Sequence, residues 1–296
     1  MSARRRMGLD NSGTDLPVLL PGAERLASRA RRERLVGTIP RLHWSHGAAL
    51  TALIVLWAGM AEAQTGADQP GVFDALFRWM PLLLEGFGFN ILISFMSMAI
   101  GTAVGVVLGL GQISLLAPVR GSSWLVTQFF RNAPWLVLLF FVMFMMPFEF
   151  VLFGVVFPFP DWVKATIGLA LPVMANVSEI VRGAVMSVPS GQWESSESLA
   201  FNRRQTLFMI ILPQCIKRMI PPWMNLYAIL TMATVLASIV GVSEMMTLTR
   251  RALAAEQNAF TLLVPFYGFV LLCFFAYCYP IARFTLYLER RYHVIT

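Results

Sequence analysis

Charged residues are scarce in this chain, which has 296 residues of which only 13% are Asp, Glu, Lys or Arg. Soluble domains carry about 25% charged residues, so about half of the usual solvated surface is missing. Hydrophobic residues make up 57% of the chain, and the mean hydropathy is +0.66. This composition excludes an ordinary soluble domain. It predicts an all-α membrane protein, because a helix satisfies its own backbone hydrogen bonds in lipid.

Cysteine and histidine are also rare. The three cysteines show neither a paired framework nor a metal-ligand spacing, and we interpret them as reduced apolar fillers: Cys215, Cys273 and Cys278. The three histidines all lie in terminal regions: His43, His46 and His293. Clustered carboxylates and a GxxxxGK[ST] phosphate loop are absent as well. We therefore predict no enzyme activity, no cofactor and no metal site in this chain.

Long apolar runs dominate what is present. The first, residues 47–61, has only fifteen residues and ends in a signal-peptidase-like Ala-Glu-Ala. It is predicted either as an extra N-terminal membrane helix or as a cleaved signal segment. In the second, Gly101, Gly105 and Gly109 form a stripe that allows another helix to approach closely. Five segments follow the first run and have about the length of a membrane span: 86–113, 125–147, 163–188, 223–246 and 262–288.

Basic residues are distributed unevenly, and nine of the 23 lie in the first 41 positions. Beside an apolar segment, such a cluster indicates the cytoplasmic side or contact with anionic lipid more simply than nucleic-acid binding. We place the N-terminus, the C-terminus and the loops 114–124 and 188–221 inside, as the positive-inside rule favours. Only four basic residues then lie outside: Arg78, Lys164, Arg250 and Arg251.

The polar stretch 188–221 is the most informative part of the sequence. It predicts a short helix at 194–199, a turn at Phe201-Asn202 and a second helix at 203–211 that ends at Pro213. Four apolar side chains among its charges need a partner surface: Leu199, Phe201, Leu207 and Phe208.

The residues of this stretch resemble the EAA motif of ATP-binding-cassette importer permeases, which reads E-A-A, three residues, G, nine residues and I-x-L-P. Here it reads Glu194-Ser195-Ser196, then Ala200, then Ile210-Ile211-Leu212-Pro213. The wider sequence resembles the polar amino-acid permease family over about residues 73–291. The matching stretches are 130–134, 175–183, 187–192, 221–222, 236–238 and 241–242.

This resemblance implies a type I importer permease bundle with five core transmembrane helices and an extra N-terminal helix. It implies a coupling hairpin that docks in a groove of a separate ATPase subunit. The residues expected to make that contact are Glu194, Ser195, Ser196, Glu197, Ala200, Phe201, Leu212 and Pro213. The domains are expected at 1–44 (basic cytoplasmic segment), 45–72 (extra helix or signal-like segment and linker), 73–291 (permease domain with its hairpin at 189–213) and 292–296 (tail).

The chain departs from the family pattern at several positions. Two motif alanines are serines, and the motif glycine is Ala200, which resists a tight turn if its φ is positive. Polar groups that are common in the family are replaced by apolar residues: Leu138, Leu226, Met232 and Ala233.

Some polar residues remain within the apolar segments and are candidates for a translocation path. Glu179 and Arg182 lie three residues apart on one helix face, as either a structural ion pair or part of the path. A stripe of hydroxyls either lines a cavity or bonds back to its own helix. The stripe consists of Thr231, Thr234 and Ser238, and Asn225 lies on the same segment.

The resemblance implies a multi-pass permease subunit that imports a polar amino acid across the bacterial inner membrane. Glutamate, aspartate or their amides are suggested by the Arg131-Asn132-x-Pro134 signature. The implied partners are ATPase subunits, a periplasmic or extracellular solute-binding protein, an identical or related second permease, and membrane lipid, but no nucleic acid. The alternative is a stand-alone secondary transporter or channel, which predicts an internal repeat and midplane charge. A membrane enzyme is the third possibility.

Overall fold

Long apolar helices make up most of the described chain, as the sequence predicts. The computed structural model describes residues 71–152 and 155–292, together with positions 47–49, 51–52, 56 and 59. Within these residues, four helical stretches are long and apolar enough to cross a membrane, or five spans if one bent helix pair is included. The long helices are α3 (Val72–Gln112), α6 (Asp161–Met186), α9 (Leu212–Ala233) and α11 (Ala259–Tyr292).

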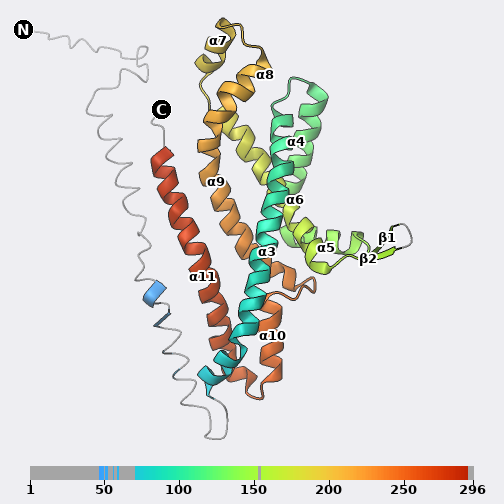
Figure 1. Ribbon diagram of the computed structural model, residues 1–296, viewed down its shortest axis with the longest axis vertical. Helices are drawn as coiled ribbons and strands as arrows, with labels where there is room; N and C mark the ends of the chain where they lie inside the picture. Colours follow the sequence, from blue (N-terminus) through green and yellow to red (C-terminus); the bar gives the residue numbers. More distant parts are fainter. Residues whose placement is uncertain are drawn as a thin grey trace, which may run out of the picture. The chain divides into compact units, whose positions relative to one another are not determined.

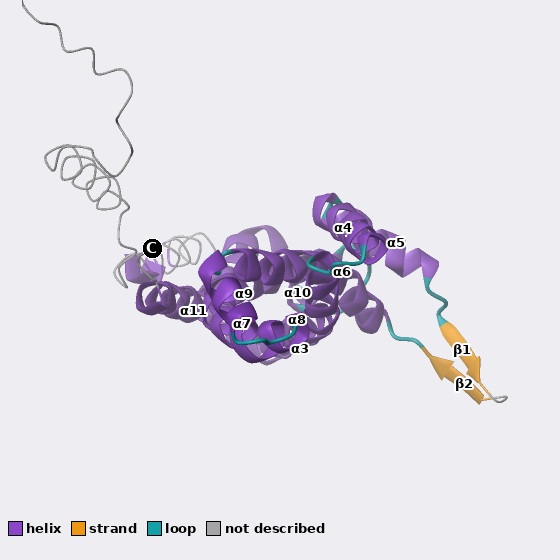
Figure 2. Ribbon diagram, turned by 90° about the horizontal axis from the view of Figure 1, so that it is seen from above, coloured by secondary structure: helices purple, strands orange, loops and turns teal. Residues whose placement is uncertain are grey.

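Shorter elements connect the long helices (Figure 1). Helices α7 and α8 lie at one end of the bundle, and α10 lies at the opposite end. Strands β1 and β2 pair in antiparallel fashion and project sideways from the helices (Figure 2). The shorter elements are α4 (Ala117–Asn132), α5 (Trp135–Met145), β1 (Glu149–Leu152), β2 (Val155–Pro158), α7 (Ser190–Ser198), α8 (Arg203–Gln205), a π-helical turn (Thr206–Ile211), a 3-10 turn (Thr234–Ser238) and α10 (Met245–Ala255).

The predicted third segment is not one straight helix. It is divided into α4 and α5, which meet at a bend of 106°. The break lies at Ala133 and Pro134, whose backbones are extended rather than helical. Proline disfavours the helical conformation in the residue before it, so α4 ends there and α5 begins afresh at Trp135.

The predicted helix at 203–211 and the predicted fifth segment at 223–246 form one helical stretch. It begins at Arg203, as predicted for the first of them, but continues without the predicted break and ends at Ser238, before the predicted end at 246. Pro213 does not end a helix, because it lies in the first turn of α9 and follows the π-helical turn directly. Proline has no backbone N–H to donate within a continuous helix, and the helix departs from regular α geometry in the π-helical turn directly before it.

The glycine stripe of α3 packs against α6, as predicted. A Cβ added at Gly101 would lie 2.5 Å from Val173, one at Gly105 would lie 2.6 Å from the carbonyl oxygen of Met174, and one at Gly109 would lie 2.7 Å from Val181. These distances leave no room for a side chain. The two backbones therefore approach as closely as small residues allow.

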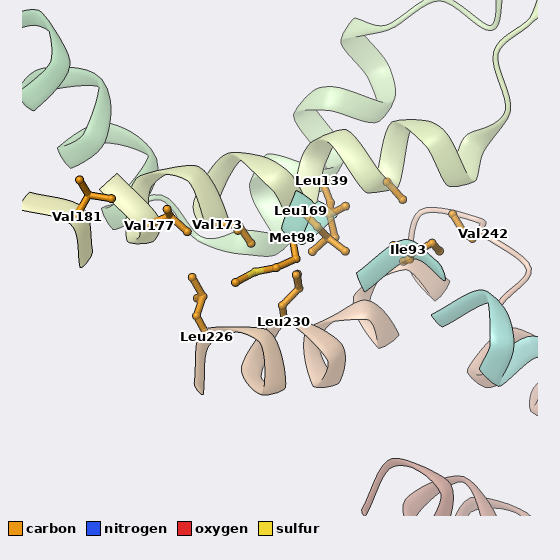
Figure 3. Packing of buried hydrophobic residues seen from close by; sticks show 12 residues of the cluster. Ile93, Met98, Leu139, Leu169, Val173, Val177, Val181, Leu226, Leu230 and Val242 are labelled. Carbon is orange, nitrogen blue, oxygen red and sulfur yellow. The ribbon is translucent and has the colours of Figure 1, made fainter. Parts of the chain in front are cut away.

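Two apolar clusters hold the remaining helices together. One joins α3, α5, α6 and α9, with Leu169, Val173 and Leu230 at its centre (Figure 3). The other joins α3, α10 and α11 around Phe266. Most of the predicted N-terminal segments, 1–44 and 45–72, and the tail after Tyr292 lie outside the described residues.

Candidate coupling hairpin and translocation path

A helical hairpin at one end of the bundle carries the predicted motif. Helix α7 starts after Pro189 and ends at Leu199, so the predicted short helix is present but begins earlier than expected. Ala200 then adopts a left-handed backbone with a φ of 59°, the only non-glycine residue with positive φ in the described chain. The motif glycine therefore belongs to a position that needs this conformation, and this chain places an alanine there.

The chain re-enters a helix through a capping box. The Asn202 side chain accepts a hydrogen bond from the backbone N–H of Gln205 (2.9 Å), and the Gln205 side chain accepts one from the N–H of Asn202 (2.9 Å). Two backbone donors at the helix start are thus satisfied reciprocally. This fixes the direction in which the hairpin returns toward the membrane.

The tip of the hairpin is exposed and mixes acidic with apolar side chains. Glu194, Ser195 and Glu197 are exposed, whereas Ser196 is only 2% exposed and donates to the carbonyl of Gln192 (2.7 Å). The apolar residues Leu199, Phe208 and Met209 are 70%, 57% and 65% exposed, respectively. These exposed apolar side chains leave surface on the hairpin that a partner could cover.

The base of the hairpin is anchored in a small core. Val185 and Val188, at the end of α6, pack with Ile211 and Cys215 at the start of α9. Trp193 of α7 packs against this cluster, and the guanidinium of Arg203 lies 5.3 Å from its ring centroid. The tip is therefore joined to both α6 and α9 through packed side chains.

The predicted pair of Glu179 and Arg182 is present and has a third member. Arg182 donates to Glu179 through Nε (3.2 Å) and Nη2 (2.8 Å), and Arg131 lies 3.4 Å from the same carboxylate. The Glu179 side chain is 14% exposed, so one largely buried carboxylate holds two guanidinium groups. Because Arg131 lies at the end of α4, this cluster ties the bent helix pair to α6.

The hydroxyl stripe of the fifth span is buried and turned inward. Thr231 donates to the carbonyl of Tyr227 (3.0 Å), and Thr234 donates to that of Thr231 (2.7 Å), which is the back-bonding that the sequence left open. Ser238 is 8% exposed. Asn225 is exposed on the outer face of α9, away from this stripe.

A buried polar network beside Thr234 was missed from the sequence. Asn90 donates to Thr234 (3.0 Å) and to Glu244 (3.0 Å), and its side-chain oxygen accepts from the backbone N–H of Met245 (3.1 Å). Glu244, which is 0% exposed, also caps α10 by accepting from the N–H of Thr247 (2.9 Å). Asn90 and Glu244 both lie inside predicted apolar segments, where a polar side chain is costly unless it has partners. Their presence there was the signal in the sequence that could have indicated the network.

The apolar replacements occupy different environments. Leu138 and Leu226 are 4% and 7% exposed, respectively, so they are part of the packing, whereas Met232 is 52% exposed. Ala233 is partly exposed at the end of α9. Among the described residues, no group of three or more His, Cys, Asp or Glu side chains is arranged to hold a metal ion.

A pocket of about 330 Å³ lies near the end of the bundle opposite to the hairpin. It contains two carboxylates, from Glu85 and Asp161. The Asp161 carboxylate forms an ion pair with the ammonium group of Lys164 (3.3 Å). This ammonium group is buried and lies 3.6 Å from the centroid of the Phe148 ring. The full lining is Leu82, Glu85, Phe89, Asp161, Trp162, Gly241, Val242, Ser243 and Leu248.

The comparisons with known proteins agree with this architecture. Residues 101–294 match the family described as "Binding-protein-dependent transport system inner membrane component". The chain is 35% identical over 212 residues to "Probable amino-acid ABC transporter permease protein YckA" of Bacillus subtilis (strain 168), covering 72% of this chain and 89% of that protein. It is 30% identical over 223 residues to "Inner membrane amino-acid ABC transporter permease protein YhdY" of Escherichia coli (strain K12), covering 75% of this chain and 60% of that protein.

The fold also matches a solved structure titled "Crystal structure of an amino acid ABC transporter with histidines". The TM-score is 0.61 at 20% identity, over 73% of this chain and 96% of that one. The family match over residues 101–294 identifies the chain as a transport permease. The chain belongs to the family of binding-protein-dependent inner membrane components, among the amino-acid ABC permeases. It is a multi-pass inner membrane protein, and a partner subunit handles the ATP.

Proposed function

We propose that this permease imports a polar amino acid, driven by ATP hydrolysis on a partner ATPase that binds the hairpin tip. The observation that carries the proposal is the exposed tip on a packed base. Glu194, Glu197 and Leu199 are exposed for a partner, while Trp193 joins the tip to the ends of α6 and α9. Closure of the ATPase would then move both spans as a rigid body. Family membership argues against the alternative of a stand-alone transporter, since the family is described as binding-protein-dependent.

The outer pocket supports an amide rather than an acidic substrate. Glu85 and Asp161 would repel the side-chain carboxylate of glutamate or aspartate, whereas they attract the α-ammonium group that every amino acid carries. Asp161 is partly neutralised by Lys164, and Glu85 is exposed to an incoming solute. Among the substrates suggested by the family signature, glutamine and asparagine fit this pocket best.

We propose that the translocation path is shared with a second permease. The hydroxyl groups of Thr231 and Thr234 donate to carbonyl groups of their own helix, so they are not free to donate to a substrate. In addition, several positions that are polar in the family are apolar in this chain. A zwitterion without polar partners in a dry passage costs several kcal/mol. We therefore favour a heterodimer in which a sister permease supplies most of the substrate contacts, while this subunit supplies helix packing and the hairpin. A homodimer whose passage is lined by carbonyls, hydroxyls and water is the rival arrangement.

Reconstitution into vesicles tests these statements together. The chain is inserted with its ATPase and binding protein, with or without the sister permease, and ATP-dependent uptake of labelled glutamine and glutamate is measured. We expect uptake of glutamine to exceed that of glutamate, and only when the sister permease is present. Full uptake without the sister permease would refute the heterodimer. Stronger glutamate uptake would refute the amide assignment, and uptake that does not require ATP would refute the function.

A further inference from the structure

A second cavity, of about 510 Å³, lies at the end of the bundle where α3 turns into α4, the same end as the coupling hairpin (Figure 1). None of its lining residues belongs to the hairpin or to the outer pocket. It is formed by three helices, α3, α4 and α6. The lining residues are Gln112, Ala117, Arg120, Gly121, Trp124 and Arg182.

Two guanidinium groups give the cavity a positive charge. Arg182 uses Nε and Nη2 for Glu179, so its other N–H groups remain available on a side chain that is 39% exposed. Arg120 is exposed, and its Nη1 lies 3.5 Å from the carbonyl oxygen of Ser114, at the long limit of a hydrogen bond. The cavity also lies at the start of α4, where the helix dipole favours an anion. Arginine forks match phosphate oxygens geometrically.

A buried amide lies beside the two arginines. Gln112 of α3 is 5% exposed, and its Nε2 donates to Ser178 of α6 (2.8 Å) and to Thr127 of α4 (3.2 Å). The three helices that line the cavity are therefore fixed to one another by side-chain hydrogen bonds, which holds the positions of the two guanidinium groups.

The surroundings of the cavity are those of a membrane interface. Leu115, Leu116 and Leu125 are 68%, 65% and 63% exposed, and Trp124 is 54% exposed at the rim. Tryptophan is enriched at the level of lipid headgroups, and basic pockets between spans on the cytoplasmic side bind anionic headgroups. A soluble anion would make no use of the apolar rim.

We propose that this cavity binds the headgroup of an anionic phospholipid, for which phosphatidylglycerol is the probe. Its phosphate pairs with Arg120 and Arg182, and its acyl chains lie along Leu116 and Leu125. The lipid would thereby brace the α3–α4 corner against α6. This inference does not depend on the substrate or on the subunit partners of the permease.

Native mass spectrometry of the full-length chain, purified with its ATPase partner, tests the proposal. Retention of phosphatidylglycerol is compared with that of phosphatidylcholine, whose headgroup carries no net charge, and glycerol phosphate is the free competitor. We expect selective retention of phosphatidylglycerol, and Arg120→Gln should lower it about fivefold, the effect of losing about one interfacial charge. Arg251→Gln, an exposed arginine on α10, is the matched control and should change nothing.

Gly121→Leu provides an independent variant that keeps every charge. A Cβ at Gly121 meets no atom within 4 Å, so the added side chain fills the cavity without straining the helix. We expect it to abolish selective retention while the melting temperature is preserved. Equal retention of both lipids, unchanged retention in Arg120→Gln and Gly121→Leu, or an equal loss in Arg251→Gln would each overturn the proposal. Displacement by millimolar glycerol phosphate would assign the site to a free anion and overturn it as well.

Discussion

The seam between α3 and α6 and the hairpin of α7 and α8 differ in how they use small residues. In the seam, the absence of side chains at Gly101, Gly105 and Gly109 brings two backbones into direct contact. In the hairpin, Ser195 and Ser196 bond only to carbonyls of their own helix and leave the tip free for a partner. The seam therefore holds α3 and α6 in close contact, whereas the tip of the hairpin is exposed. In the proposed function, the tip is the part that the ATPase moves.

This difference bears on the proposed coupling. If an ATPase moves the hairpin as proposed, the force would pass into α6 through the small core of Val185, Val188 and Ile211. Because α6 cannot slide on α3 without separating the glycine contacts, both helices must follow together. If α3 and α6 packed loosely, α6 could move without moving α3. If the hairpin tip were buried within its own protein, the ATPase could not contact it.

The largest effect is expected from filling the seam. Gly105→Leu places a Cβ 2.6 Å from the Met174 carbonyl and 2.7 Å from Val177 Cβ, so the helices must part. We expect a loss of about 3 kcal/mol in stability, the upper end of typical overpacking costs. Thermal unfolding in detergent measures it. Gly88→Leu, on the same helix with nothing within 4 Å, is the control, and an equal loss there would contradict the seam account.

A smaller effect is expected from the buried network at the opposite end of the bundle. Asn90→Leu keeps the volume but leaves the Met245 N–H unpaired and deprives the Glu244 carboxylate of one donor. Unsatisfied buried groups cost about 1–3 kcal/mol, and we expect about 2 kcal/mol. The same unfolding assay decides it, with the exposed Asn225→Leu as control. A harmless Asn90→Leu would mean that this network does not hold α10 in place.

The smallest effect is expected to be favourable. Ala200→Gly relieves a left-handed backbone that costs alanine about 1 kcal/mol, so the hairpin should gain about that amount. Hydrogen exchange of the α7–α8 amides should slow accordingly. Ala228→Gly, at a right-handed position within α9, is the control and should instead destabilise its helix. Faster exchange in Ala200→Gly would show that the turn is not strained.

The sequence predicted the spans and the motif better than their connections. Apolar runs and spacing located the helices, the glycine stripe and the pair of Glu179 and Arg182, because each of these depends on local periodicity. The bend at Pro134 and the continuation through Pro213 were predicted wrongly, since a proline ends or starts a helix depending on the backbone before it.

The buried networks were beyond local reasoning for a different reason. Asn90 and Glu244 are 154 positions apart, and only the folded chain shows that each satisfies the other. The same holds for Gln112, whose donors are used on Ser178 while its acceptor is left open. Polar residues in apolar segments predict that partners exist, but they do not identify them. The strands β1 and β2 were not predicted at all.

The most direct test of the account is the amount of amino acid imported per ATP hydrolysed. Glu194→Lys reverses an exposed charge on the hairpin tip without touching the packed base. In vesicles that contain the assembled transporter, we expect it to keep ATP hydrolysis but to lower uptake per ATP at least tenfold, whereas Glu289→Lys, an exposed glutamate on α11, leaves the ratio unchanged. An unchanged ratio in Glu194→Lys, at normal subunit assembly, would contradict the claim that this hairpin couples hydrolysis to transport.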